Sequence, residues 1–119
     1  MEKVILAEKL QLFAEYWDPK IVGELNGQQV KLAKFKGEFV WHQHDNEDEL
    51  FFVIEGVLKI AFRDRTVVIN PNEFLIVPKG TAHKPVADEE VAVMLFEPAT
   101  TLNTGNTENK FTKQLLDSI

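Results

Sequence analysis

All three histidines of this 119-residue chain lie in two short motifs that are far apart in the sequence. His42 and His44 are two residues apart, so both side chains face the same side of an extended strand. Glu49 opens the next apolar segment, and His83 comes much later, after several strand-like segments. His83 can reach the first three residues only across a sheet that closes on itself, as in a β-barrel.

Three imidazoles and one carboxylate at this spacing predict a metal site. The predicted ligands are His42, His44, Glu49 and His83. This mixed set of nitrogen and oxygen donors suits iron, manganese, nickel, zinc or copper, and it does not suit calcium. Four protein ligands on a six-coordinate ion leave two positions free, which is typical of catalytic rather than structural sites.

Each predicted ligand also has a simpler interpretation. Taken alone, His83 fits a partly buried loop histidine that precedes Pro85, and Glu49 fits a solvated member of the acidic run at residues 45–49. Glu47 is a competitor for Glu49, because it also follows His44 closely. The joint pattern of four suitable residues favours a metal site over these separate interpretations.

The first motif resembles the first of the two motifs of the cupin family. It reads Gly37, four residues, His42-Gln43-His44, four residues, Glu49, six residues and Gly56. Only the leading glycine departs from the family pattern, by one position. The six-residue gap before Gly56 selects Glu49 over Glu47.

The second motif resembles the other cupin motif. It reads Asn72, five residues, Pro78-Lys79-Gly80, two residues, His83, three residues and Ala87. The family has glycine and asparagine where this chain has Asn72 and Ala87, but asparagine tolerates a positive φ and neither change touches a ligand position. The resemblance covers roughly residues 20 to 98 and implies all four metal ligands.

The resemblance and the strand pattern predict an all-β fold, a single cupin jelly-roll barrel (a double-stranded β-helix) with short terminal helices. Strands are expected at residues 21–25, 30–35, 39–44, 50–55, 57–62, 66–70, 74–77, 83–86 and 91–96, and Asn26-Gly27 predicts a hairpin turn. Apolar residues at helical spacing predict helices at about 4–17 and 108–118. We expect one domain over residues 1–119, with the barrel core at about 20–98.

Composition excludes several classes of protein. The chain has no cysteine, so disulfides and thiolate metal sites are excluded. A net charge of −6 argues against nucleic acid and anionic membrane as partners. Charged residues interrupt the N-terminal segment and no long apolar run follows, so we expect neither a signal peptide nor a membrane span, and a cytoplasmic location.

Two strands predict an interface. The segments 50–54 and 74–77 are apolar at every position, so both of their faces should be covered. If Glu49 faces the barrel interior, then Leu50, Phe52 and Ile54 face outward and need a partner. We therefore expect a homodimer.

The sequence leaves the reaction open. Within the cupin family, the resemblance implies a small metalloenzyme of isomerase or dioxygenase type that acts on an oxygen-rich small molecule, or a binding or sensing barrel with a structural metal, or a barrel that has lost its metal. Residues 97–105 resemble a segment of small bacterial cupins that are often labelled mannose-6-phosphate isomerase-like, a label that does not identify a substrate.

No general base is identified, and Lys59, Arg63 and Trp41 are expected to face away from the site. Candidate pocket walls, or simple barrel core, are Phe39, Phe51, Val53, Phe62 and Met94.

Overall fold

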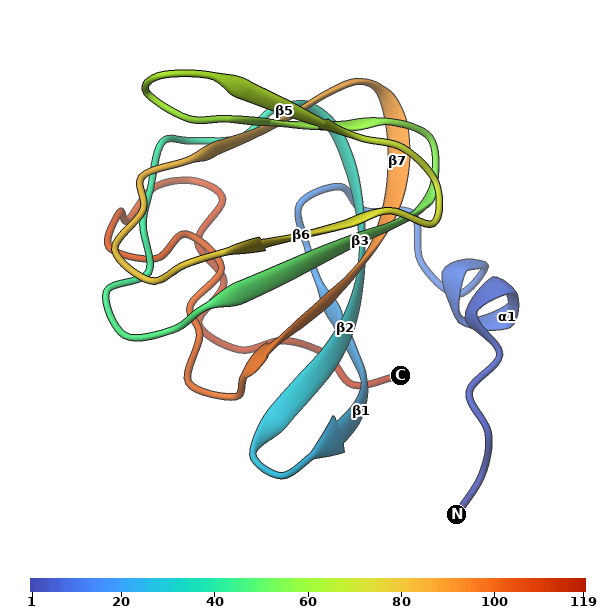
Figure 1. Ribbon diagram of the computed structural model, residues 1–119. Coiled ribbons are helices and arrows are strands. Elements are labelled where there is room, and N and C mark those ends of the chain that lie inside the picture. Colours follow the sequence, from blue (N-terminus) through green and yellow to red (C-terminus); the bar gives the residue numbers. More distant parts are fainter.

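Seven strands and one short helix form the regular elements of the computed structural model, which describes residues 1–119 (Figure 1). The elements are α1 (Leu6–Leu10), β1 (Lys20–Leu25), β2 (Gln28–Glu38), β3 (Glu49–Glu55), β4 (Leu58–Ala61), β5 (Thr66–Ile69), β6 (Phe74–Val77) and β7 (Lys84–Pro98). All strand pairs are antiparallel. The predicted all-β class and jelly-roll barrel are confirmed. The helix, only five residues long, is far too short to span a membrane.

The long strand β7 joins the two halves of the barrel. Its second half lies between β2 and β3 in the strand order β1-β2-β7-β3-β6, and its first half pairs with β4, which in turn pairs with β5. The register with β2 shifts between Phe35 and Gly37, opposite the exposed residues 88–90. Such an irregularity lets one strand bend and serve two sheets.

The turn between β1 and β2 follows directly from the sequence. Asn26 and Gly27 have φ values of 50° and 79°, and two positive φ values in a two-residue loop are typical of a type I′ turn. The strands run on in register from Leu25 opposite Gln28. The predicted hairpin is confirmed.

Alternating residues of each strand fill the barrel. On β3, Glu49, Phe51 and Val53 are buried while the residues between them are half-buried, as the alternation predicted. Thirteen side chains form one contiguous core: Trp17, Ala33, Phe35, Phe51, Val53, Leu58, Ile60, Ile69, Val77, Ala87, Val91, Val93 and Leu95. The interior is therefore packed mainly with apolar side chains, and the buried polar residues include those of the site described below.

The N-terminal helix is shorter than predicted. It ends at Leu10 instead of extending to residue 17, and it lies outside the barrel (Figure 1). The Lys34 ammonium donates to the carbonyl oxygens of Leu10 and Phe13 at 2.8 and 2.7 Å. A side chain thus occupies carbonyl oxygens that would accept backbone hydrogen bonds if the helix were longer. Trp17 has a φ of 60°, which is incompatible with a right-handed helix.

The predicted C-terminal helix at residues 108–118 is wrong. The segment forms turns, in which the side chain of Asn109 accepts from the backbone N–H of Phe111 and Asn103 accepts from that of Lys113. Such bonds compete with helical hydrogen bonds. The end of the chain instead pairs with β1, where Ile119 donates to the carbonyl of Ile21 at 2.9 Å.

Two strand predictions also need correction. Residues 39–44 do not form a regular strand, and only His42 makes an isolated bridge, to His83. The segments 83–86 and 91–96 are not separate strands, because β7 runs without interruption from Lys84 to Pro98. The acidic residues between them stay solvated on a strand instead of forming a turn.

The turn after β3 offers a test of the fold. Gly56 has a φ of +85°, and an added Cβ would lie 2.7 Å from the backbone oxygen of Glu90. Gly27 has a similar φ of +79° and open space around it. We expect Gly27→Ala to lower the free energy of unfolding by about 1 kcal/mol from backbone strain alone, and Gly56→Ala by about 2 kcal/mol or more because of the added clash. Urea unfolding measures both, and equal losses would contradict the close approach of β7.

Candidate metal centre

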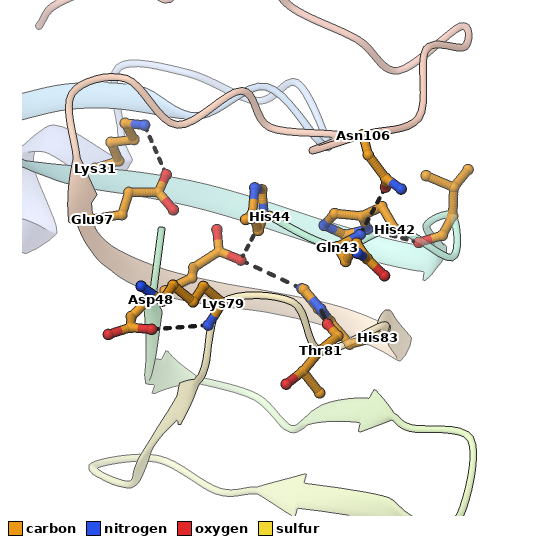
Figure 2. Close-up of polar contacts among 12 residues, drawn as sticks. Lys31, His42, Gln43, His44, Asp48, Lys79, Thr81, His83, Glu97 and Asn106 are labelled. Atoms are coloured by element: carbon orange, nitrogen blue, oxygen red, sulfur yellow. Dashed lines mark hydrogen bonds and ion pairs between the residues drawn. The ribbon is translucent and has the colours of Figure 1, made fainter. Parts of the chain in front are cut away.

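The fold brings His42, His44, Glu49 and His83 together inside the barrel. One potential ligand atom from each residue lies within 4.8 Å of every other. All four are buried, with exposed fractions between 0 and 4%. In Figure 2 the three imidazole rings surround one small space, and dashed lines mark contacts of His44 and His83 with a carboxylate, that of Glu49. The four residues named from the sequence thus converge.

Backbone pairing between the two motifs creates this convergence. His42 N–H donates to the carbonyl of His83 at 3.0 Å, and His83 N–H donates to that of His42 at 2.9 Å. On either side of this pair, Phe39 donates to Pro85 and Gly80 donates to the carbonyl of His44. The two histidine-bearing segments therefore lie antiparallel, with their side chains on the inner face.

Backbone carbonyls orient two of the three rings. The Nδ1 atom of His42 lies 2.9 Å from the carbonyl of Val40, and that of His83 lies 2.8 Å from the carbonyl of Thr81. A carbonyl can only accept, so each Nδ1 carries the proton and each Nε2 is left with a free lone pair. A backbone carbonyl that holds the Nδ1 proton in this way is usual for histidines that bind metal through Nε2.

The cluster contains several buried polar atoms without a hydrogen-bond partner. They are both ring nitrogens of His44, Nε2 of His83 and Oε1 of Glu49. Each such atom costs about 1–3 kcal/mol when it remains unsatisfied. Glu49 Oε1 lies 3.2 Å from His44 Nε2 and 3.5 Å from His83 Nε2. Two donors that each lie about 2.1 Å from one ion are separated by roughly 3 to 4 Å, so the spacing of Glu49 from His44 and His83 fits a shared divalent cation.

The structure separates Glu49 from its competitor. Glu47 lies outside the cluster, where its carboxylate accepts a hydrogen bond from the Thr100 hydroxyl at 3.0 Å. Glu49 is the first residue of β3 and faces the histidines. The spacing to Gly56 therefore selected the residue that the fold places in the cluster.

A buried ion pair beside the cluster was missed by the sequence analysis. Lys31 Nζ lies 2.7 Å from Glu97 Oε1, and both side chains are almost completely buried (Figure 2). The available signal was the alternation of β7, in which Val93, Leu95 and Glu97 all face inward. Glu97 thus continues a buried apolar row with a charged residue.

The two buried glutamates have opposite pKa shifts. Burial would raise the pKa of Glu49, but the proximity of Glu97, His44 and His83 outweighs it and holds this pKa well below the ordinary value. Burial raises the pKa of Glu97 well above its ordinary value, the charge of Glu49 adds to the rise, and Lys31 opposes it. Of the two buried carboxyl groups, Glu49 is therefore the more acidic.

A cavity adjoins the cluster within the barrel. Its polar lining consists of His42, Glu49, Glu97 and Asn103, and the rest includes aromatic and aliphatic side chains, among them Trp17, Phe35, Phe39, Phe51 and Leu95. Trp17 stacks between Phe35 and Phe39, with ring centroids 4.3 and 4.7 Å away. A mostly apolar wall with a few convergent polar groups resembles the lining of a small-molecule site, but the volume of about 20 Å³ holds only about one water molecule.

The other residues considered from the sequence divide between lumen and surface. Phe39 and Phe51 line the cavity, and Val53 is in the core. Phe62 is half-buried, with its ring 6.5 Å from that of His83. Met94 is not a wall, because it alternates with the buried Val93 and Leu95 and faces outward.

The sequence analysis expected three charged or aromatic residues to face away from the site, and all three lie towards the outside. They are Lys59, Arg63 and Trp41. Lys59 pairs with Asp88 at 2.8 Å on the surface. The guanidinium carbon of Arg63 lies 3.9 Å from the centre of the Trp41 ring, and Arg63 is exposed. Neither Lys59 nor Arg63 therefore places an unpaired positive charge next to the cluster.

The C-terminal segment covers the cluster on one side. Gly105 approaches so closely that an added Cβ would lie 2.2 Å from the carbonyl oxygen of Gln43 and 3.2 Å from the His42 ring. Asn106 holds the same segment by accepting from the N–H of Gln43 at 3.0 Å. This contribution was not foreseen from the sequence, because residues 100–107 read as a polar loop.

Comparison with known families now identifies the fold. The family model described as "Cupin domain" matches residues 28–98, which include both histidine motifs. The chain belongs to the cupin family. The four residues that converge in the barrel are those at the ligand positions that the family resemblance implied.

Several relatives share this cupin architecture. A cupin-2 domain containing protein from Shewanella frigidimarina is 45% identical, with a TM-score of 0.79 over 80% of this chain and 93% of that one. Protein NMB1881 from Neisseria meningitidis is 31% identical, with a TM-score of 0.76 over 82% of this chain and all of that one. The "Uncharacterized protein YdbB" of Bacillus subtilis is 48% identical over 64 residues, 53% of this chain and 57% of that protein. The match to YdbB thus spans little more than half of its length.

The buried His42 predicts how the stability of the metal-free cupin depends on pH. Burial, and then the charge of His83, lower the pKa of His42 from 6.5 to about 4. Between these values the unfolded chain binds the proton and the folded chain does not, so the free energy of unfolding falls as the pH drops from 6.5 to 4, by roughly 3 kcal/mol at most from this residue. Chemical denaturation of chelated wild type and His42→Gln across this range isolates the effect, because the other titrating groups are common to both. Parallel pH profiles would contradict it.

Proposed function

We propose that His42, His44, Glu49 and His83 bind one divalent transition-metal ion and that this cupin is a small metalloenzyme. The observation that carries the proposal is the group of buried, unpartnered donor atoms that converge from two distant motifs. Burying four unsatisfied donors together without a cation would cost several kcal/mol. The absence of sulfur ligands supports iron, manganese, nickel, zinc or copper, and leaves the choice among them open.

The surroundings of the cluster support small-molecule chemistry. When bound, such an ion serves as a Lewis acid for a hydroxy or carbonyl compound or, if it is iron, as a redox centre. The cavity next to His42 and Glu49 has a volume of about 20 Å³, room for about one water molecule, so a larger ligand would bind there only after side chains of the lining move. We propose an oxygen-rich small molecule as the ligand and an isomerase or dioxygenase type of reaction. The net charge of −6 supports this class of ligand over nucleic acid.

One observation favours a second function, a binding or sensing barrel with a structural metal. The cluster is almost completely buried, and Trp17 and the C-terminal segment cover it and its cavity. A closed metal site that only strengthens the fold would have the same burial. The two functions differ in what metal removal does to stability.

Metal analysis tests the proposed centre. We expect wild type to retain about one divalent ion per chain after dialysis, and His44→Ala to retain much less, because His44 has no other partner in the structure. Gln43→Ala is the matched control, since its amide bonds the exposed Asp45 carboxylate, and it should retain the metal. Elemental analysis by mass spectrometry measures all three. Equally negligible metal in wild type and His44→Ala would contradict the metal centre and indicate a cupin that has lost its ion.

Chelation of the same wild-type sample separates the two functions. A catalytic centre on a barrel that already folds predicts unchanged strand content by circular dichroism and a small loss in melting temperature. A large drop in melting temperature on metal removal would contradict the catalytic interpretation and favour the structural one.

We also propose that this cupin forms a homodimer through the outer face of β3, β6 and β7. On this face Leu50 lies between Ile76 and Phe96, and Phe52 lies between Phe74 and Met94. Phe74 and Ile76 are 60 and 52% exposed, and the other four are half-buried. A contiguous apolar patch of this kind supports an interface.

Substitutions on the exposed strand β6 test the dimer without disturbing the core. We expect wild type to have twice the 13.6 kDa mass of one chain, and Phe74→Asp and Ile76→Asp to shift it to the monomer mass by burying a charge in the interface. Val68→Asp is the control, because Val68 is 51% exposed on β5, away from the patch. Light scattering after gel filtration gives the masses, and a monomeric wild type would contradict the proposal.

A further inference from the structure

The chain that follows β7 folds into one compact loop, residues 102–113, beside the metal cluster. Hydrogen bonds within the loop join its two ends. The side chain of Asn103 accepts from the backbone N–H of Lys113 at 2.9 Å, and the hydroxyl oxygens of Thr104 and Thr112 are 2.7 Å apart. A surface loop that is held together by its own side chains can move as one unit.

The loop is attached to the barrel next to a predicted metal ligand. The N–H of Gln43 donates to the side-chain oxygen of Asn106, and the N–H of Asn106 donates back to the Gln43 carbonyl, both at 3.0 Å (Figure 2). Gln43 stands between His42 and His44, and the close approach of Gly105 to the His42 ring lies at the same point. The loop therefore covers the part of the barrel that carries the two histidines of the first motif.

The same loop also closes the cavity beside the cluster. Asn103 is part of the cavity lining. The Phe111 ring lies 5.3 Å from that of Phe39 and 6.2 Å from that of Trp17, which are two further residues of the lining. The enclosed volume of about 20 Å³ holds about one water molecule, so a larger molecule enters only if part of this lining moves.

Two surface hollows flank the loop, and each reaches one predicted ligand. The lining of one, with a volume of about 200 Å³, includes His42, and the lining of the other, with about 150 Å³, includes His44. Asn106 lines both hollows, so its contact with Gln43 lies between them. Displacement of the loop would join the two hollows above the histidine rings.

We propose that loop 102–113 is a lid that must lift from Gln43 before a metal ion or a small molecule reaches the cluster. Its purpose rests on the proposed metal centre, but its movement needs no bound ion. The polar attachment of the lid to the barrel consists of the two Asn106 bonds and a longer one, from the Thr107 hydroxyl to the Trp41 carbonyl at 3.3 Å. Because Asn106 is exposed, water can replace its bonds, as is typical of segments that open locally.

Two substitutions loosen the lid without touching a predicted ligand. Asn106→Ala removes the acceptor for the Gln43 N–H. Gly105→Ala places a Cβ 2.2 Å from the Gln43 carbonyl oxygen and so pushes the loop outward.

Three control variants match these changes elsewhere. Asn46→Ala removes an exposed side chain beside the same hollow that has no hydrogen bond to the loop. Gly27→Ala introduces strain at a positive φ in open space. Gly56→Ala destabilises the whole fold, because its added Cβ meets β7 instead of the loop.

Histidine modification of the metal-free full-length protein measures the opening of the lid. All three histidines of the chain lie in the cluster, so the rate at which diethyl pyrocarbonate modifies imidazole reports on access to the cluster alone. We expect Asn106→Ala to react about 3- to 10-fold faster than wild type through the loss of one hydrogen bond, and Gly105→Ala about 10-fold faster or more. The three controls should stay within about twofold of wild type.

Two results of this experiment would overturn the lid. Modification that is as fast in Gly56→Ala as in the lid variants would show that the histidines are reached by unfolding of the whole barrel. Wild-type rates in both Asn106→Ala and Gly105→Ala would show that reagents reach the cluster by another route.

Co²⁺ uptake by the same metal-free proteins tests whether the lid controls metal entry. If the lid must open first, the rate of uptake levels off as the Co²⁺ concentration rises, and the limiting rate is higher in the two lid variants than in wild type. Equal uptake rates in wild type and both lid variants at every Co²⁺ concentration would contradict this role. Wild type that takes up no Co²⁺ would refute the metal centre, whereas histidine modification would still decide whether the lid opens.

Discussion

The mutual backbone hydrogen bonds between His42 and His83 are the constraint on which the rest of the site depends. They join two segments that are distant in the sequence, and they do so at the residues that carry the rings. The pairing is a single bridge rather than a regular strand, so neighbouring contacts must support it. Gly80 supplies one of them by donating to the carbonyl of His44, and residues Gly105 and Asn106 of the C-terminal segment supply others from the opposite side.

The polar side chains at the site inside the barrel form one cluster, and their arrangement is explained only when they are considered together. Apolar side chains fill most of the lumen, and the polar side chains buried around the site are the three histidines, two glutamates and Lys31; Lys20, Thr101 and Thr104 are also buried. Lys31 forms an ion pair with Glu97, and backbone carbonyls fix two of the rings with Nε2 free. What remains unsatisfied is a set of donor atoms around one point, and a cation at that point would satisfy them.

The residues that could be predicted from the sequence are those governed by local rules. Spacing of two along a strand placed His42 with His44, and two positive φ values at Asn26-Gly27 gave the hairpin. With Glu49 facing inward, alternation on β3 correctly turned Leu50, Phe52 and Ile54 away from the buried face. The resemblance to the cupin family supplied the long-range link to His83, which no local rule provides.

The features that were not predicted depend on tertiary contacts. The N-terminal helix ends early because Lys34 takes the carbonyls of Leu10 and Phe13, and Lys34 is remote from them in sequence. The C-terminal segment has helical spacing at Phe111 and Leu115, but asparagine side chains bind its backbone and its end pairs with β1. Glu97 was overlooked because a charged residue at the end of a strand usually faces water, and only the fold shows its partner Lys31.

The central claim, that four side chains share one ion, is tested most directly by an anomalous difference map from a crystal grown with a transition metal. The account predicts one strong peak inside the barrel, within roughly 2.0–2.2 Å of a ring nitrogen of each histidine and of a carboxylate oxygen of Glu49. A fully ordered site with no peak among these four residues, or a peak bound only at surface carboxylates, would contradict it.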